Sequence, residues 1–154
     1  MTNRPTVAVA ALLLVLAVIA GCGLFTAQQP GSAAARDLAA HLDAWRASGP
    51  SSYSYTITRS CFCPFTDPLR VTVTNGVTTA ITKAGQPAAA EELSFLPKTV
   101  PEAFKVVSDN LAAAKIAVTY DPTFGFPTSI VVDSIANAID DEFSMTLTDF
   151  APAP

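Results

Sequence analysis

The sequence predicts an α+β domain in which two helices pack on one face of a curved antiparallel sheet. The first observation is the order of the expected elements, which runs helix, three strands, helix, three strands (α-β-β-β-α-β-β-β). The second is that short connections join consecutive strands, which favours antiparallel pairing. The third is length, because residues 36–150 suffice for a single domain with one hydrophobic core. Both helices then bury their apolar stripes against the same sheet face.

The first half begins with a helix over residues 34–48 and continues with a strand that starts at residue 53. An apolar stripe at helical spacing indicates the helix, and Gly49-Pro50 ends it. Apolar side chains that alternate with hydroxyl side chains indicate a half-buried strand. The helical stripe is Leu38, Leu42 and Trp45, and the apolar strand positions are Tyr53, Tyr55 and Ile57.

A hairpin is predicted over residues 71–81, where Val71–Val73 and Val77–Ile81 flank Asn75-Gly76. Asn and Gly tolerate the positive φ angles that a tight type I′ turn requires. The residues that follow, 84–98, are rich in alanine and proline and show no clear period. We therefore expect a loop there.

The second half is predicted to begin with a helix after Thr99 and to continue with three strands. Thr99 and Glu102 are three residues apart with Pro101 in the first turn, which is a pattern typical of helix starts. In the last strand, apolar and hydroxyl residues alternate again. The helical stripe is Phe104, Val107 and Leu111, and the strands are expected over residues 116–121, 129–135 and 143–150.

The N-terminal segment predicts export and lipidation. An uncharged apolar run of 14 residues from Val7 to Ala20 is shorter than the roughly 20 residues of a membrane span, but it fits a secretory signal peptide. The stretch Ile19-Ala-Gly-Cys22 resembles the lipobox of bacterial lipoproteins, where the cysteine takes a diacylglycerol and becomes the new N-terminus. We expect residues 1–21 to be the signal peptide, Cys22 the lipidated residue and residues 22–35 a flexible tether. An ordinary secreted protein with a chance cysteine is the alternative.

Composition and motifs favour a non-enzymatic binding or accessory module of the cell envelope. A lipid on Cys22 would anchor the protein to the cell membrane in an extracytoplasmic location, where we expect another envelope protein as its partner. The net charge of −4 argues against nucleic acid. The sequence has no phosphate-binding Gly-rich loop, no His-Glu-x-x-His and no Gly-x-Ser-x-Gly. We predict no catalytic residue, metal or cofactor; a hydrolase built on Asp121, Asp133 and Asp141 is the least favoured alternative.

Cys61 and Cys63 are the two cysteines that remain if Cys22 is lipidated. Alternate residues of a strand lie about 6.7 Å apart, whereas the Cβ atoms of a disulfide lie about 3.8 Å apart. Bonding the pair therefore requires a bend, which Pro64 favours. We favour a structural disulfide ring at the end of the first strand. A redox-active pair and a soft-metal site are the alternatives, and they define the runner-up function, an envelope redox or metal-binding protein.

The loop from Tyr120 to Pro127 is the candidate binding site. Every residue type in it also suits a plain turn, because Asp accepts backbone N–H bonds, Pro fixes φ and Gly adopts left-handed conformations. A binding role requires an exposed phenyl ring, since aromatics at a loop tip anchor partners, and it predicts that Phe126→Ala leaves folding nearly intact. The candidate binding residues are Tyr120, Asp121, Phe124, Gly125, Phe126 and Pro127.

Several of these motifs also occur together in a known family. The most specific are Cys61-x-Cys63 and Tyr120-Asp-x-x-x-Gly-Phe-Pro127. Over residues 36–150 the chain resembles an uncharacterised family of bacterial, largely actinobacterial, secreted lipoproteins whose domain has no known function. The resemblance implies an extracytoplasmic domain, and it implies no activity, ligand or catalytic residue. The other shared positions are Trp45, Tyr53, Tyr55, Asn75-Gly76, Val100–Phe104, Asp133 and Asp140–Glu142.

Overall fold

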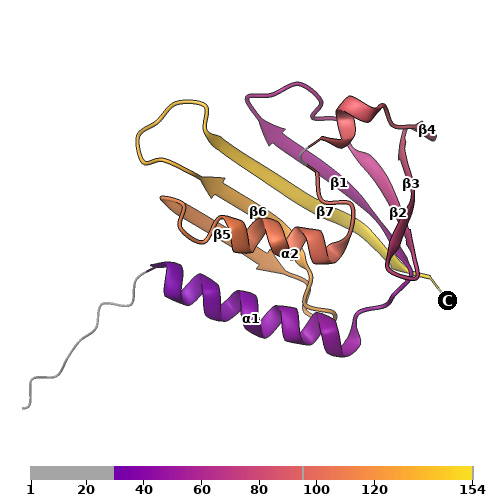
Figure 1. Cartoon of the computed structure of the whole chain (residues 1–154), viewed down its shortest axis with the longest axis horizontal. Coiled ribbons are helices and arrows are strands. Elements are labelled where there is room, and N and C mark those ends of the chain that lie inside the picture. Colours follow the sequence, from indigo (N-terminus) through magenta and orange to yellow (C-terminus); the bar gives the residue numbers. More distant parts are fainter. Residues whose placement is uncertain (1–29, 95, 154) are drawn as a thin grey trace, which may run out of the picture.

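The computed structural model of the chain describes residues 30–94 and 96–153 (Figure 1). The expected signal peptide, Cys22 and the tether up to residue 29 lie outside the described residues. Residues 30–35, which were predicted as the end of the tether, are helical instead and form the start of the first helix, four residues earlier than expected. The elements in chain order are α1 (Pro30–Ser48), β1 (Tyr53–Cys61), β2 (Leu69–Thr74), β3 (Val77–Lys83), β4 (Gln86–Pro87), the 3₁₀ helix η1 (Ala90–Leu93), α2 (Val100–Asp109), β5 (Lys115–Tyr120), β6 (Pro127–Asp133) and β7 (Glu142–Pro152).

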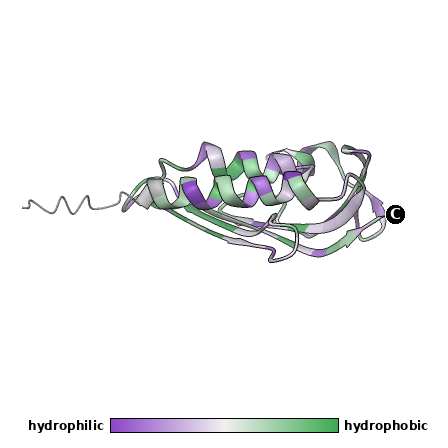
Figure 2. Cartoon of the chain, turned by 90° about the horizontal axis from the view of Figure 1, so that it is seen from below, coloured by the Kyte–Doolittle hydropathy of each residue, from purple (hydrophilic) through white to green (hydrophobic). Residues whose placement is uncertain are grey.

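The strands form one seven-stranded antiparallel sheet in the order β4-β3-β2-β1-β7-β6-β5. The first strand and the last therefore pair at its centre, where Ile57 lies opposite Leu147. Both helices cover the same face, and the sheet curls towards them when it is seen edge-on (Figure 2). The predicted α+β class, antiparallel sheet and one-sided helices are confirmed, and the element order is close to the predicted one, with β4 and η1 added.

Three predictions from short sequence patterns are confirmed: the start of α2, the turn between β2 and β3, and the end of α1. The side chain of Thr99 accepts the Glu102 backbone N–H at 3.3 Å, which caps the start of α2. Asn75 and Gly76 have φ angles of +52° and +79°, as a type I′ turn requires. The first helix ends at Ser48, directly before the glycine and proline.

The prediction of a plain loop over residues 84–98 is wrong in part. Gln86–Pro87 pairs with β3 as β4, and Ala90–Leu93 forms η1. The carboxylate of Glu92 accepts from the Lys83 ammonium at 2.6 Å and from the Ala89 backbone N–H at 2.9 Å. The turn thus depends on a charge supplied by β3, which local composition does not reveal.

The hydrophobic core lies between the helices and the sheet, and two tyrosines tie the chain before α2 to it. Tyr53 accepts the Val100 backbone N–H at 2.9 Å, and the Tyr55 hydroxyl donates to the Pro97 carbonyl at 3.1 Å. Burial raises the pKa of both phenols, so they stay protonated at neutral pH. Along β1 these buried aromatics alternate with half-buried hydroxyl residues on the opposite face, as predicted.

Candidate functional site

The loop Tyr120–Pro127 is a turn held by its own backbone and by one carboxylate. Oδ1 of Asp121 accepts the N–H groups of Thr123 at 2.9 Å and Phe124 at 2.7 Å. Gly125 has a φ of +79°, and its N–H donates to the Asp121 carbonyl at 2.9 Å. A Cβ on Gly125 would lie 2.8 Å from the His41 carbonyl oxygen. The glycine therefore lets the loop lie directly against the backbone of α1.

Both phenyl rings of this loop pack into the protein. Phe126 is 2% exposed and stacks on Phe150, with 4.3 Å between the ring centroids. Phe124 is half-buried and packs against the same ring at 5.6 Å. Trp45 of α1 meets Phe126 edge-on at 6.2 Å. Neither ring is exposed, so the aromatic residues of the loop form part of the core on which α1 rests, and the exposed anchor that a binding role required is not present in this loop.

Tyr120 links the same loop to α1 through a second stacking contact. Its ring lies 3.9 Å from the His41 ring, and the two planes differ by 9°. Burial, with a smaller contribution from the Asp37 carboxylate, raises the pKa of Tyr120 to about 12. The pair thus packs as neutral phenol against imidazole and joins α1 to β5.

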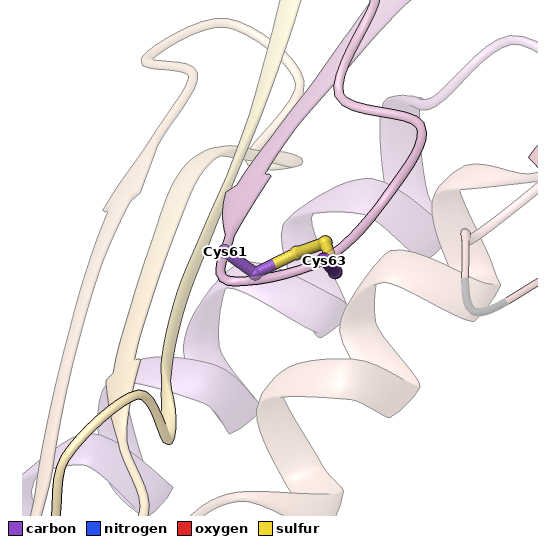
Figure 3. The surroundings of a disulfide bond; sticks show 2 residues. All are labelled: Cys61 and Cys63. Atoms are coloured by element: carbon purple, nitrogen blue, oxygen red, sulfur yellow. A yellow bond between two sulfur atoms is a disulfide. The ribbon is translucent and has the colours of Figure 1, made fainter.

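Cys61 and Cys63 form a disulfide where β1 ends (Figure 3). The backbone bends as the sequence required, because the Cys63 N–H donates to the Cys61 carbonyl at 2.8 Å and the two Cα atoms are 5.2 Å apart. The intervening Phe62 is 83% exposed, so the ring stands at a solvent-exposed tip. With the two sulfurs bonded to each other, the soft-metal alternative loses both thiolate ligands, whereas the structural and redox alternatives keep what they need.

The structure also contains a site that the sequence did not reveal, a pocket of about 580 Å³ between α1 and α2. This volume falls within the roughly 300–1,000 Å³ typical of small-molecule sites. Its floor is apolar, and its side chains come from the two helical stripes, the first strand and the start of α2. We call it the interhelix pocket, and its floor is lined by Leu38, Leu42, Trp45, Tyr53, Pro101 and Phe104.

Gly49 shapes one end of the interhelix pocket. A Cβ at this position would lie 2.5 Å from the Trp45 ring, so only glycine lets the indole fold back over the end of α1. The Gly49 N–H also donates to the Trp45 carbonyl at 2.7 Å, which closes the last turn. The same residue therefore ends the helix and makes room for the largest side chain of the pocket floor.

Two cations stand at the rim of the interhelix pocket, one on each helix. Arg46 pairs with Asp43 at 3.4 Å and Lys105 pairs with Asp109 at 2.6 Å. The side chains of the cations are 67% and 71% exposed, respectively. Exposed pairs within one helix contribute only about 0.3–0.5 kcal/mol, so either cation can leave its partner for a stronger anion. The pocket thus combines an apolar floor with a rim that can receive negative charge.

Residues 30–94 and 96–153 contain no cluster of three His, Cys, Asp or Glu side chains arranged to bind a metal ion. Within the same ranges, α1 and α2 are too short or too polar to cross a bilayer. Asp141, one of the carboxylates considered for hydrolysis, accepts the Ile135 backbone N–H at 2.6 Å. That contact fixes the connection between β6 and β7.

The chain belongs to a family of unknown function, DUF6174, whose model matches residues 37–152. The match agrees with the sequence-based resemblance to a domain of unknown function over residues 36–150. The bacterial source, the lipoprotein character and the family motifs stay predictions. No curated protein and no solved structure matches the chain.

Proposed function

We propose that this protein is a lipid-anchored extracytoplasmic binding module, without catalytic activity, whose interhelix pocket takes an amphipathic anion. The observation that carries the proposal is the pocket of about 580 Å³ with an apolar floor between two helices and a cation on each rim. The location rests on the sequence alone, through the signal peptide over residues 1–21, the lipidated Cys22 and the tether that precedes α1. An envelope protein partner would deliver or receive the bound molecule.

The class of ligand follows from the chemistry of the floor and the rim. The floor residues Leu38, Trp45 and Phe104 are buried and offer no side-chain carboxylate or amine, so an acyl chain suits them better than a polar body. Arg46 and Lys105 can each donate charge-assisted hydrogen bonds to a carboxylate or phosphate head. A single-chain amphiphile with one anionic head, such as a fatty acid, matches both parts.

Trp45 offers a direct test, because it is the single tryptophan of the chain and lines the pocket. Stearate that carries a nitroxide next to its carboxylate should quench Trp45 fluorescence with saturation. Lys105→Glu should weaken binding at least about tenfold, since a hydrogen bond to a charged group contributes about 1.5–3 kcal/mol and 1.4 kcal/mol is a factor of ten. Lys115→Glu makes the same charge change on the distant strand β5 and should leave the affinity unaltered.

The methyl ester of the same nitroxide lipid separates the two parts of the proposal. It keeps the acyl chain and lacks the negative charge, so it should bind more weakly than the acid and should not respond to Lys105→Glu. Equal binding of ester and acid would overturn the anionic head group. Absence of quenching by both would overturn the pocket as an acyl-chain site.

A second candidate function, thiol–disulfide exchange with an envelope thiol, rests on the disulfide at the exposed tip of the β1–β2 connection. Cys63 also lines a cavity of about 360 Å³ together with Arg59 and Glu91. A partner chain could approach the sulfurs there, because the residues Phe62 and Phe65 are 83% and 47% exposed, respectively.

The double variant Cys61→Ser/Cys63→Ser distinguishes a structural disulfide from a redox one. The disulfide closes a loop with one intervening residue, so we expect its loss to lower the free energy of unfolding by less than about 2 kcal/mol. Thermal unfolding followed by circular dichroism measures this loss. A structural disulfide should also resist reduced glutathione at millimolar concentration, whereas complete exchange within minutes would make redox chemistry the leading function.

A further inference from the structure

We infer that one end of the sheet inserts into the surface of a bilayer of zwitterionic phospholipid when the anchor holds the protein there. The side chains that enter are Phe62, in the connection between β1 and β2, and Ile135 and Ile139, in the connection between β6 and β7. We call these three residues the apolar tips. The inference rests on the lipidated Cys22 of the proposed function, and its surface is separate from the interhelix pocket.

Exposed apolar residues concentrate at this end of the sheet. Among the residues that the structure describes, six large apolar residues are exposed, and four of them lie in these two connections. The apolar tips Phe62, Ile135 and Ile139 are 83%, 63% and 87% exposed, and Phe65 is the fourth. Apolar side chains gathered on an exposed surface mark sites that contact a protein partner or a membrane.

The two connections are neighbours because β1 and β7 pair along their length. Cys61, at the end of β1, lies opposite Phe143 near the start of β7. Phe62 therefore leaves β1 beside the point where the β6–β7 connection enters β7. Both connections lie at the same end of the sheet, and the C-terminus lies at the other end (Figure 1).

The apolar tips are held in place by contacts within each connection. The disulfide between Cys61 and Cys63 closes a ring that includes Phe62 (Figure 3). In the other connection, the Ile135 backbone N–H donates to the Asp141 carboxylate at 2.6 Å. Because these contacts are already made in the protein, little conformational freedom remains to be lost when the tips enter the bilayer.

The chain enters the domain at the same end of the sheet. Ala33 and Ala34, at the start of α1, line a cavity together with Ile116 of β5. Its neighbour Lys115 lies opposite Asp133, the last residue of β6 before the connection that contains two of the apolar tips. The start of α1 and the β6–β7 connection are thus joined through the first residues of β5.

A lipid on Cys22 would keep this end of the domain close to the bilayer. Residues 22–29 span at most about 28 Å even when fully extended, at about 3.5 Å for each residue. A tether this short raises the effective concentration of the apolar tips at the bilayer to about the millimolar range. Weak apolar contacts then suffice to orient the anchored protein, whereas the tips without the anchor would bind only marginally.

The charges beside the apolar tips favour a zwitterionic lipid. Asp140 and Glu142 are exposed carboxylates next to the Ile139 tip, and they repel an anionic bilayer surface. A zwitterionic phospholipid presents its ammonium group outermost, so the carboxylates meet positive charge while the tips pass between the headgroups.

Fluorescence quenching by brominated lipid tests this contact. The mature chain, lipidated at Cys22, is reconstituted in phosphatidylcholine vesicles with or without bromine on the acyl chains. Ile139→Trp should be quenched about twofold by bromine, since interfacial side chains sit about 5–10 Å into the boundary of headgroups and acyl chains. Val77→Trp is the matched control, because Val77 is 65% exposed at the β2–β3 turn, at the opposite end of the sheet (Figure 1). The parent, which has Trp45 alone, gives the baseline for both.

Phe62→Asp, added to Ile139→Trp, tests whether the two connections enter together. It places a charge on one tip and should restore most of the fluorescence lost at the other, whereas Val77→Asp should restore none. Brominated phosphatidylglycerol at low salt should quench less than phosphatidylcholine, and stronger quenching there would overturn the choice of lipid. The inference itself is overturned by an unquenched Ile139→Trp, by equal quenching of Val77→Trp, or by quenching that Phe62→Asp leaves unchanged.

The lipidation and the apolar tips can fail separately. The intact mass of the purified chain shows whether Cys22 carries a lipid. If it carries none, a maleimide lipid coupled to the Cys22 thiol supplies the anchor, since Cys61 and Cys63 are bonded to each other. The same quenching then tests the tips. An anchored chain whose Ile139→Trp variant stays unquenched overturns the insertion and leaves the lipoprotein proposal intact, and quenching of a chain that cells leave without lipid has the opposite meaning.

Discussion

Replacing Phe126 with Ala is expected to lower the free energy of unfolding by about 3–5 kcal/mol, as for other buried phenylalanines. The ring is 2% exposed and lies between Phe150, which stacks on it, and Trp45, which meets it edge-on. Its loss leaves a cavity beneath the C-terminal half of α1. Domains of this size are stable by about 5–15 kcal/mol, so the substitution removes a large part of the total.

Urea unfolding followed by far-ultraviolet circular dichroism measures this effect, with Phe124→Ala as the matched control. Phe124 belongs to the same loop and touches the same ring, but it is half-buried. Its truncation should cost less than half as much. A Phe126→Ala protein within about 1 kcal/mol of the parent would contradict the packing described here and would return the loop to the role of an exposed anchor.

The elements that the sequence predicted well are those set by neighbouring residues. Thr99 caps α2 through an N–H three residues away, and Asn75-Gly76 closes a turn between adjacent strands, so each signal is complete within a few residues. The segment 84–98 behaves differently. Its 3₁₀ turn needs the Lys83 ammonium at Glu92, and no local pattern records that contact.

The loop Tyr120–Pro127 also depends on contacts that the local sequence does not record. The residue types of the Tyr120–Pro127 loop predicted a turn, and Asp121 and Gly125 form one. Whether Phe126 points inward depends on α1 lying across the loop, which is a tertiary contact about eighty residues away in the chain. The sequence therefore left the turn and the binding interpretation open, and the packing decides between them.

The interhelix pocket was not predicted, because it depends on how the two helices lie relative to each other. Leu38, Leu42 and Trp45 form an apolar stripe on one helix, and Phe104 belongs to the stripe of the other. Such stripes predict burial against the sheet. They do not say that the two helices diverge enough to leave a space between them. The nearest signal is Gly49, which had an adequate explanation as a helix stop before its second role beside the indole was visible.

Replacing Cys22 with Ser is expected to release the protein from the membrane fraction almost completely. A single acyl chain binds a membrane only marginally and two or more bind firmly, at about 0.8 kcal/mol for each buried CH₂. Loss of the lipidated thiol removes every chain at once. The chain carries 13 acidic and 9 basic residues, so it offers no excess positive charge to hold it on anionic lipid afterwards.

Fractionation of bacterial cells that express the parent and the variant measures this release. The Cys61→Ser/Cys63→Ser protein is the matched control, since it loses two thiols and keeps Cys22. It should stay with the membrane, and the mass of its N-terminal peptide should include the lipid. If the Cys22→Ser protein has lost residues 1–21 and still stays with the membrane after a high-salt wash, then the anchor lies elsewhere and the lipoprotein assignment fails. The interhelix pocket would still be testable in that case, because its lining begins at Leu38 of the first helix.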